Sequence, residues 1–396
     1  MALKFVDEVD FSGQRVIARF DFNVPLNSKG EITDTTRVDL AIPTIRLILE
    51  QKPKTIVLMS HLGRPKGEVK KEFSLEPVAK YLAEVLKEDV VLTESCLDQG
   101  IRTLLELPNT KIVMLENLRF HAQETSNDLE FARKLSTYGN IYVNDAFGAA
   151  HRKHASTYGI NHYYKNKAYG GLLLKKEIHA LERIVKTPKM PFCAIVGGAK
   201  VSDKIKVIES LLTRVDHLLI GGAMAYPFLK AKGHSIGQSL CSDEDVSLAQ
   251  SILRQKASVK ITLPLDHIVA DKFDATEGIN TSGVDIEEGK MGLDIGEQTL
   301  ATFRSKITAC KTVLWNGPMG IFEKEQFSKG TFGVAQVLAE LEGAFTLVGG
   351  GDSVSAVNKS GLSIKMGHVS TGGGASLEYI ENGSLPGISA LKFGLD

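Results

Sequence analysis

One local pattern occurs four times in the second half of the chain and limits the folds that this half can adopt. Each copy joins a short apolar run to two or three glycines and a polar residue: FCAIVGGAK (192–200), HLLIGGAM (217–224), FTLVGGGDS (345–353) and GHVSTGGGAS (367–376). Such runs are typical of buried parallel strands, and glycines at a strand's carboxyl end let backbone N–H groups approach a phosphate. The repetition predicts a nucleotide site built from several loops, although no copy matches the P-loop or the complete GxGxxG pattern.

Strands and helices also alternate in the first half. Strand-like runs are RVIARFDFNV, TIVLMS, KIVML and NIYVND, and helical patterns such as VDLAIPTIRLILEQK and LEPVAKYLAEVLKE lie between them. This alternation favours parallel sheets covered by helices on both faces. A length of 396 residues is too great for one typical core, so we expect two domains.

A further helical pattern, GLLLKKEIHALERIVKTP, separates the two halves, with apolar residues at helical spacing from Leu174 to Val185. We therefore predict an α/β protein with two doubly wound, Rossmann-like parallel-sheet lobes joined by a central helix and hinge, with a cleft between them. The predicted bounds are 1–169 for the N-terminal lobe, 170–189 for the helix and hinge, and 190–381 for the C-terminal lobe.

Composition argues against several classes of protein. The formal net charge is +0, which does not suit a binder of nucleic acid, and no apolar stretch is long enough to span a membrane. The first residues, MALKFVDEVDFSGQ, lack the apolar core of a signal peptide. Four scattered cysteines without a CxxC pair favour reduced thiols, so we expect a cytoplasmic protein without membrane or nucleic-acid partners.

Polar and cationic side chains follow the predicted strands of the first half. They are Asp21 and Asn23 in RVIARFDFNVP, Arg37 after the next loop, His61 and Arg64 in SHLGRP, Arg119 in ENLRF and Arg152 in AFGAAHR. Alternation places Arg19 with Asp21 and Asn23, opposite the apolar side chains. Ligands of open α/β sheets collect beyond the carboxyl ends of strands, and arginine forks suit phosphate and carboxylate oxygens. The pattern predicts a site for a small polyanion.

Each of these residues alone has an ordinary explanation. A single arginine is usually solvated or salt-bridged, His61 is more often structural, and Asp21 and Asn23 suit the capping of a turn. His151 and His154 have a spacing that suits a metal, but no third ligand is evident. Recurrence at equivalent strand ends favours the functional interpretation.

The second half carries residues suited to a nucleotide. GGAKVSDKIKVIESLL reads as a loop running into a helix, which would place Lys200 and Lys204 one turn apart on one face, beside successive phosphates. Paired lysines at this spacing are otherwise a solvated helix face. In LVGGGDSVSAV, Asp352 suits Mg²⁺ and Ser353 suits a helix cap, although capping alone would explain both.

Taken together, these motifs resemble those of the phosphoglycerate kinase family. The motifs that carry the resemblance are RFDFNVPL, SHLGRP, LENLRF, NDAFGAAHR, GGAKVSDK, GGAMA, MGLDIG, WNGPMGIFE, GGGDS and STGGGASLE, in the family's order over nearly the whole chain. The resemblance implies a glycolytic kinase that converts 3-phosphoglycerate and MgATP reversibly into 1,3-bisphosphoglycerate and MgADP. It also implies a usually monomeric enzyme whose C-terminal tail, here 382–396, returns to the N-terminal lobe.

The resemblance also assigns roles to residues. It implies that the N-terminal lobe binds phosphoglycerate through Asp21, Asn23, Arg37, His61, Arg64, Arg119 and Arg152. It implies that the nucleotide binds Lys204, Gly221, Gly222, Gly292, Asn316, Glu323, Gly350, Gly351, Asp352 and Ser353 on the C-terminal lobe, with Asp352 on Mg²⁺. The groups expected to act on the moving phosphoryl group are Lys200, Arg37 and the amides of Gly372 and Gly373.

The chemistry agrees with this assignment. A carboxylate acceptor has a pKa near 4 and is already ionised at neutral pH, so no general base is needed. Catalysis then reduces to positioning and charge stabilisation, with hinge closure to expel water. Two departures from the family's wording, Pro227 in GGAMAYPFL and the segment NKAYGGLLLKKE, touch no residue assigned to chemistry.

Two other classes are less consistent with the sequence. A two-lobed protein that only binds small anions would have no use for Lys200, Lys204 and Asp352 beside glycine loops. A nicotinamide-dependent dehydrogenase should show GxGxxG after an early strand, where this chain has DFNVP.

Overall fold

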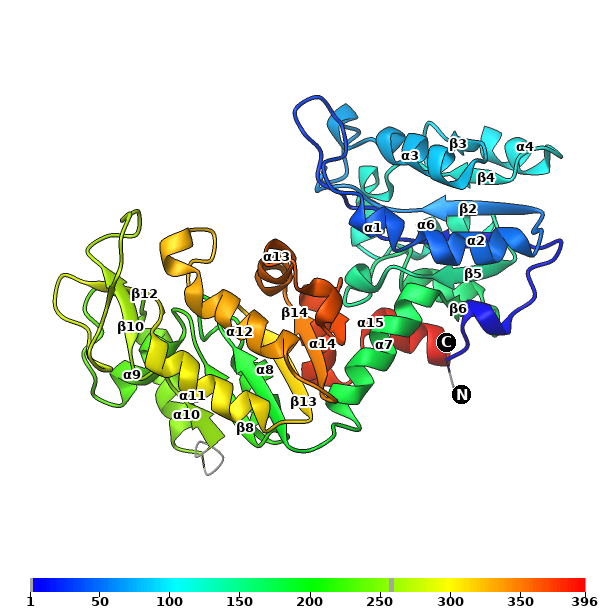
Figure 1. The fold of residues 1–396 in the computed structure, drawn as a ribbon. Helices are drawn as coiled ribbons and strands as arrows, with labels where there is room; N and C mark the ends of the chain where they lie inside the picture. The colour runs from blue at the N-terminus through cyan, green and yellow to red at the C-terminus, as the bar shows by residue number, and fades with distance from the viewer. Residues whose placement is uncertain (1–2, 256–259, 396) are drawn as a thin grey trace. The chain divides into compact units, whose positions relative to one another are not determined.

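The computed structural model describes residues 3–255 and 260–395, which form two compact units. One unit comprises Met1–His179 together with Ser384–Asp396, and the other comprises Ala180–Gly383. The division falls within the helix α7 (Leu172–Val185), which crosses from one unit to the other (Figure 1). Among the described residues, no helix has the length and apolar character needed to cross a membrane.

The first unit is built on a six-stranded sheet in the order β3-β4-β2-β1-β5-β6, and every pairing is parallel. Its strands are β1 (Arg15–Arg19), β2 (Thr55–Met59), β3 (Val90–Leu92), β4 (Ile112–Met114), β5 (Ile141–Asn144) and β6 (Ala168–Gly170). Its helices are α1 (Thr36–Asp39), α2 (Ile42–Glu50), α3 (Glu76–Leu86), α4 (Gly100–Glu106), α5 (Ala122–Thr125), α6 (Leu129–Ser136) and α15 (Pro386–Phe393). Short 3₁₀ turns connect them at η1 (Val6–Glu8), η2 (Lys71–Phe73), η3 (Leu118–Phe120), η4 (Phe147–Ala149) and η5 (Gly159–Tyr163). The helix α15 returns from the end of the chain to pack beside β6.

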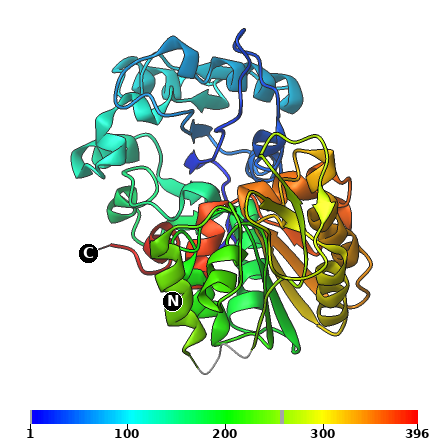
Figure 2. The same cartoon turned by 90° about the vertical axis from the view of Figure 1, so that its left-hand side faces the viewer.

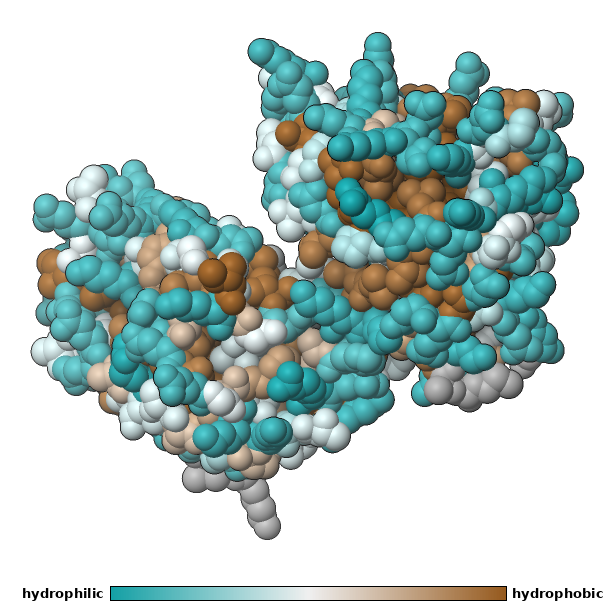
Figure 3. Space-filling model, turned by 45° about the vertical axis from the view of Figure 1, so that its right-hand side comes forward, coloured by the Kyte–Doolittle hydropathy of each residue, from teal (hydrophilic) through white to brown (hydrophobic). Residues whose placement is uncertain are grey.

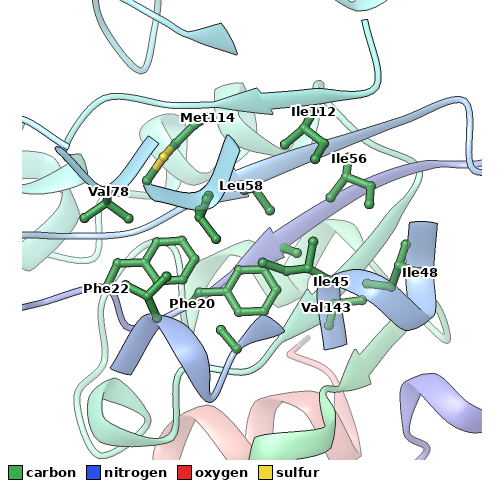
Figure 4. Close-up of a cluster of buried hydrophobic side chains, with 14 of the residues drawn as sticks. Phe20, Phe22, Ile45, Ile48, Ile56, Leu58, Val78, Ile112, Met114 and Val143 are labelled. Carbon is green, nitrogen blue, oxygen red and sulfur yellow. The ribbon is translucent and has the colours of Figure 1, made fainter. Parts of the chain in front are cut away.

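Alternation along β1 and β2 forms the core of this unit. Figure 4 shows Ile56 and Leu58 of β2 beside Ile45 of α2 and Phe20, and all four side chains are fully buried. The rings of Phe20 and Phe22 stack with centroids 5.4 Å apart. β1 ends at Arg19, earlier than the predicted run, but both phenylalanines still join the same core. The remaining strand residues are buried on the other face, so helices and loops cover both sides of the sheet, as predicted.

The second unit contains another six-stranded sheet, in the order β15-β14-β13-β7-β8-β9, again with parallel pairings throughout. Its strands are β7 (Phe192–Val196), β8 (His217–Ile220), β9 (Ile261–Thr262), β13 (Thr312–Asn316), β14 (Phe345–Gly349) and β15 (His368–Val369). Its helices are α8 (Ile205–Leu212), α9 (Ala225–Ala231), α10 (Asp243–Leu253), α11 (Glu297–Thr308), α12 (Lys329–Ala339), α13 (Gly351–Lys359) and α14 (Gly374–Asn382), with 3₁₀ turns at η7 (Glu325–Phe327) and η8 (Ser363–Lys365). Figure 2 shows the green and orange strands of this sheet side by side, with helices on both faces. The predicted fold class, two doubly wound parallel sheets, is confirmed.

The second unit also holds a three-stranded antiparallel sheet that the sequence analysis did not predict. It comprises β11 (Ile279–Asn280), β10 (His267–Ala270) and β12 (Met291–Ile295), in that order. Val269 of β10 packs with Tyr226 and Leu229 of α9 in a small buried cluster. α9 begins at Ala225, so Pro227 lies in its first turn, where a missing N–H leaves no helical bond unmade.

Exposed apolar side chains are scattered over both units. Val69, Ile364 and Phe393 are among the most exposed. On the face drawn in Figure 3, hydrophilic side chains surround smaller areas of hydrophobic ones. In both units, the candidate site residues lie in the loops that follow the carboxyl ends of the parallel strands.

Candidate active site

The carboxyl ends of β1, β2, β4 and β5 are neighbours in the first sheet, and the predicted anion-binding residues follow them. Asp21 and Arg37 form an ion pair, with Arg37 Nη1 2.6 Å from Asp21 Oδ2. The loop after β5 passes close to this pair, because a Cβ on Gly148 would lie 2.6 Å from Asp21 Oδ2. The structure therefore brings Asp21, Arg37 and the 147–149 segment together.

A second set of contacts joins the loops after β1, β2 and β4. Asn23 Oδ1 accepts a hydrogen bond from the N–H of Gly63 at 2.8 Å. The carbonyl of Gly63 accepts one from Arg119 Nη1 at 2.8 Å. Gly63 thus holds both predicted side chains in place around the SHLGRP turn.

Three of the predicted arginines, Arg64, Arg119 and Arg152, line a cavity of about 450 Å³, and Arg37 does not. Its lining consists of Arg64, Lys66, Gly67, Arg119, Ala122, Thr125 and Arg152. Burial, and then the charges of Arg19 and Arg152, lower the pKa of Arg119 to about 10. Crowded, partly desolvated cations stabilise an anion strongly, so this cavity suits a phosphate or carboxylate group.

The cavity includes four residues that the sequence analysis missed: Lys66, Gly67, Ala122 and Thr125. Lys66 has a left-handed backbone, with φ of 61°, and is followed by Gly67 at φ of 83°. Their place in GRPKG, directly after a predicted anion-binding turn, was the available signal. Thr125 lies at the end of the short helix α5 and gave no comparable signal.

His61 lies deeper than the arginines around the cavity. It is 5% exposed, and its Nδ1 lies 3.0 Å from Nη2 of Arg19. Burial lowers its pKa well below the ordinary value, and the charges of Arg19 and Arg119 lower it further. His61 is therefore neutral, and it can bind an anion only as a hydrogen-bond donor.

His151 and His154, whose spacing suits a metal, have separate partners. Nε2 of His151 accepts a hydrogen bond from Nε of Arg152 at 3.1 Å. Nδ1 of His154 lies 3.6 Å from Oε1 of the buried Glu124. In residues 3–255 and 260–395, no three His, Cys, Asp or Glu side chains form a group able to hold a metal ion.

In the second unit, glycine turns follow β7, β8 and β13 and approach one another closely. A Cβ on Gly222 would lie 2.7 Å from the carbonyl of Pro318 and 2.8 Å from the nitrogen of Gly198. Gly222 also has φ of +65°. On Gly221, a Cβ would lie 2.4 Å from Sδ of Met319. At Gly222 only glycine permits this packing, because the atoms that a Cβ would meet belong to the backbone and real Cβ atoms do not make contacts below 3.0 Å. At Gly221 the side chain of Met319 would have to move.

The two lysines do not share a helix face, so that prediction was wrong. α8 begins at Ile205, with Lys204 as its N-cap and Lys200 exposed in the preceding segment. The N–H of Ser202 is bonded to the carboxylate of Asp245 at 2.8 Å, which holds this segment in a non-helical conformation. Lys204 Nζ instead turns back to the carbonyl of Gly197 at 2.7 Å.

Lys204 is partly buried between the turns that follow β7 and β13. Its Nζ lies 3.4 Å from the carbonyl of Asn316, in addition to its bond with Gly197. Desolvation lowers its pKa to about 8, against the opposing effect of Asp352. A phosphate placed on these turns would find this ammonium group already in position.

Asn316 and Ser353 join the glycine turns to one another. Nδ2 of Asn316 donates to the carbonyl of Gly349 at 2.8 Å, while its Oδ1 is buried without a partner. Ser353, expected as a helix cap, instead accepts a hydrogen bond from the N–H of Gly317. The N-cap of α13 is Gly350, with φ of 89°, because the chain must turn sharply between β14 and that helix. Gly351 is the first residue of α13.

A larger cavity, of about 500 Å³, opens beside these turns. The predicted nucleotide residues that line it are Gly222, Gly292, Glu323 and Asp352. The missed lining residues include Tyr226, Gln238, Leu240, Phe273, Met291 and Leu293, which make much of the wall apolar. Their signal was weak because Tyr226 comes from α9, Met291 and Leu293 come from β12 of the small antiparallel sheet, and the other three come from connecting loops.

The last predicted group lies at the start of α14. Gly373 is the N-cap of this helix, with φ of 51°. The N–H of Gly372 donates to Oγ of Ser370 at 3.2 Å. A phosphoryl oxygen would have to replace this hydroxyl to use the amide of Gly372.

The residues present fit a magnesium ion carried by a nucleotide. Asp352 is an exposed carboxylate on the wall of the larger cavity, one residue into α13. Mg²⁺ usually takes one or two carboxylates together with substrate phosphates and water. A single carboxylate beside a phosphate site is therefore sufficient.

Comparison with known proteins agrees with this geometry. A profile of the phosphoglycerate kinase family matches residues 6–383. Curated relatives named phosphoglycerate kinase include one from Anaeromyxobacter sp. (strain Fw109-5), 50% identical over 99% of this chain and 100% of its own length, and one from Borrelia hermsii (strain HS1 / DAH), 51% identical over the same shares.

Solved structures give the same result. The structure of phosphoglycerate kinase from Coxiella burnetii superposes with a TM-score of 0.89 at 39% identity and covers 98% of this chain and 99% of its own. That of the Pyrococcus horikoshii OT3 enzyme superposes with a TM-score of 0.83 at 31% identity and covers 98% of each chain. The chain therefore belongs to the phosphoglycerate kinase family, and it is a phosphotransferase.

Proposed function

We propose that this phosphotransferase moves the γ-phosphoryl group of MgATP reversibly to the carboxylate of 3-phosphoglycerate, giving 1,3-bisphosphoglycerate and MgADP. The observation that carries the proposal is the arginine-lined cavity of about 450 Å³ in a chain of this family. The proposed domains are a phosphoglycerate-binding lobe (1–169 with 382–396), a helix and hinge (170–189) and a nucleotide-binding lobe (190–381).

In the first lobe, Arg64, Arg119 and Arg152 bind the phosphate of 3-phosphoglycerate, since all three line one cavity. Asp21 accepts a hydrogen bond from the hydroxyl group, and His61 and Asn23 complete the site. Arg37 is held by Asp21 in the free protein. It is therefore placed to serve the reacting carboxylate once the ligand engages Asp21.

In the second lobe, the apolar part of the larger cavity takes the base, and Glu323 accepts hydrogen bonds from the ribose hydroxyls. Lys204 and the turns at Gly221–Gly222 and Gly350–Gly351 hold the phosphates, with Asn316 and Ser353 maintaining the turns. Asp352 holds the Mg²⁺ ion, which neutralises charge on the phosphates when bound.

No proton needs to be removed from the attacking carboxylate, so the residues act by position and charge. Lys200, Arg37 and the amides of Gly372 and Gly373 stabilise the negative charge on the equatorial oxygens of the moving group. Loss of one such donor typically costs about 3–4 kcal/mol in the barrier.

Transfer requires the reacting atoms to approach within about 3–3.5 Å. Since the two ligands bind different lobes, we expect closure about the hinge, which also excludes water that would hydrolyse ATP. Small-angle X-ray scattering tests this step. Both substrates together should reduce the radius of gyration more than either does alone, and no compaction would contradict the closure.

We further propose that the enzyme acts as a monomer in the cytoplasm. The resemblance to the family supports a monomer, and the four free cysteines support the cytoplasm. Sedimentation at working concentrations tests the oligomeric state, and a dimer would contradict it.

A chemical trap tests the reaction itself. The protein is incubated with MgATP, 3-phosphoglycerate and hydroxylamine, which captures an acyl phosphate as a hydroxamate but leaves a phosphate ester unchanged. Hydroxamate that depends on all the components is expected. Release of ADP without hydroxamate would mean a different acceptor, and the absence of any reaction would favour a protein that only binds anions.

A further inference from the structure

Three buried polar residues form a hydrogen-bonded network that ends at His61, and none of the three is among the residues assigned to phosphoglycerate. Arg19 of β1, Glu124 of α5 and Ser156 are each fully buried. Glu124 and Arg19 carry opposite charges, yet Ser156 separates them. Buried charges persist only when they are paired or hydrogen-bonded, so this arrangement requires an explanation.

In this hydrogen-bonded network, each donor and each acceptor can be identified. Oγ of Ser156 donates to Oε1 of Glu124 at 2.6 Å, because an ionised carboxylate only accepts. The same Oγ accepts from Nε of Arg19 at 2.9 Å. Nη2 of Arg19 lies 3.0 Å from Nδ1 of His61. Every donor and acceptor between Glu124 and His61 is therefore assigned.

Glu124 is the anion at the inner end of this network. Burial would raise its pKa, but the nearby His154 imidazole, the charge of Arg19 and the hydrogen bond from the hydroxyl of Ser156 outweigh burial, so the pKa is lowered. Its carboxylate also accepts the N–H of Ser156 at 3.0 Å, and its carbonyl accepts the N–H of Ala155 at 2.9 Å. Glu124 thus joins the segment that carries Arg119 to the segment that carries Arg152.

At the outer end, the contact with Arg19 determines which nitrogen of His61 bears the proton. A guanidinium group has donors and no acceptor, so Nδ1 of His61 must accept. A neutral imidazole then carries its proton on Nε2. The opposite tautomer would set two N–H groups against each other inside the protein.

We propose that Glu124, acting through Ser156 and Arg19, is a positioning residue that holds His61 as the neutral Nε2–H tautomer, so that Nε2 donates to an anionic oxygen of phosphoglycerate. The part concerning phosphoglycerate rests on the proposed function. The tautomer itself does not, because it is a property of the free protein. Glu124 offsets the charge of Arg19, and Ser156 fixes the guanidinium plane that faces Nδ1.

The test reads the ring nitrogens of His61 by two-dimensional NMR of protein labelled with ¹⁵N-histidine, with His61→Gln used to assign its signals. The charged and titratable groups that act on His61 are Arg19, Arg119, Arg37 and His154. The proposal expects the Nε2–H tautomer throughout pH 5.5–8, with and without 3-phosphoglycerate. A proton on Nδ1, or titration of the ring within that range, would overturn the proposal on the unmodified protein.

Glu124→Gln provides the second readout, since it keeps the shape and removes the charge. The variant should show a mixture of His61 tautomers and an increase of about 10-fold or more in KM for 3-phosphoglycerate, with KM for MgATP unchanged. Ser156→Ala removes the hydroxyl that joins Glu124 to Arg19 and should have the same effects. This variant replaces Glu124→Gln in the test if Glu124→Gln fails to fold. A folded Glu124→Gln protein with unchanged His61 signals and unchanged KM would overturn the proposal.

Asp266→Asn is the matched control. Asp266 is also a fully buried carboxylate, bonded to the N–H groups of Gln298 and Thr299 in the other unit. This variant should lose stability without any change in His61. If the unmodified protein shows the expected tautomer but forms no hydroxamate, the proposed function fails while the tautomer assignment stands.

Discussion

In both units the candidate site lies at the carboxyl edge of a parallel sheet, but different groups form it: charged side chains in the first unit and backbone turns in the second. The first unit uses charged side chains that are already bound within the protein: Arg37 is paired with Asp21, and Arg119 donates to the backbone carbonyl of Gly63. The second unit uses backbone turns that pack against one another so closely that a Cβ on Gly197, Gly222 or Gly317 would meet backbone atoms, with Lys204 held between them. The first site should therefore be sensitive to charge, and the second should be sensitive to added atoms.

The largest effect should come from Lys200, an exposed cation beside the glycine turns. Lys200→Ala should lower turnover by about 100- to 1,000-fold, because it removes charge stabilisation of the moving phosphoryl group. The affinity for MgATP, measured by calorimetry, should change little. Turnover equal to that of the unmodified enzyme would remove Lys200 from the mechanism.

Gly222→Ala tests the sensitivity of the second unit to one added methyl group. The left-handed backbone costs an alanine about 1–2 kcal/mol, and the contacts with Pro318 and Gly198 add about 1–3 kcal/mol. Nucleotide affinity should fall, and the affinity for 3-phosphoglycerate should not.

Gly233→Ala is the control for that variant. Gly233 also has a left-handed backbone, with φ of 92°, but no atom lies within 4 Å of its added Cβ. It should cost only the backbone strain. Equal losses of stability and of nucleotide affinity in the two variants would mean that close packing of the turns contributes nothing.

Arg64→Ala tests the sensitivity of the first unit to charge. Arg64 is exposed on the wall of the smaller cavity, so its removal should leave the fold intact. Losing a hydrogen bond to a charged group costs about 1.5–3 kcal/mol, so KM for 3-phosphoglycerate should rise about 10- to 100-fold. Steady-state kinetics with each substrate varied in turn checks this, and a rise in KM for MgATP instead would reverse the assignment of sites.

The smallest effect concerns pH and stability. Burial raises the pKa of Asp294, in the second unit, to about 8, and that of Asp145, in the first unit, to about 6. A raised carboxyl pKa means that the folded state holds the proton more tightly, so its contribution is complete at low pH and is lost as the pH rises through the folded value. Between pH 6 and 8, the second unit should lose up to about 1.4 kcal/mol per pH unit, and the first much less.

Hydrogen exchange of each unit across that range measures the difference. Asp294→Asn should flatten the pH dependence of the second unit, because the amide cannot ionise. The same slope in this variant would show that another group is responsible.

The sequence predicted the parts of the site that depend on strand ends. Glycines after apolar runs and arginines after strands lie where parallel topology must place them, so the sequence alone predicted that Gly222 and Arg119 follow strand ends, and each lines one of the two cavities. Lys200 and Lys204 were placed wrongly on one helix face, because a contact between Ser202 and the distant Asp245 decides where α8 begins. Such contacts depend on tertiary packing and leave no local pattern.

Burial of charge was equally hidden from the sequence. Arg19 follows the alternation of β1 and reads as one more cation near the site, while Glu124 reads as an ordinary helical residue. Only the fold shows that both are fully buried and joined through Ser156. The small sheet of β11, β10 and β12 was missed because two of its strands are too short to show any period.

The most direct test of the account is hydrogen exchange measured by mass spectrometry with each ligand alone. 3-Phosphoglycerate should protect the segments around Arg37, Arg64, Arg119 and Arg152 and leave the glycine turns unchanged. MgADP should protect the turns at 197–204, 221–222 and 349–353 and leave the arginine segments unchanged. Protection of the arginine segments by MgADP alone, or of the glycine turns by 3-phosphoglycerate alone, would contradict the claim that two separate sites serve two ligands.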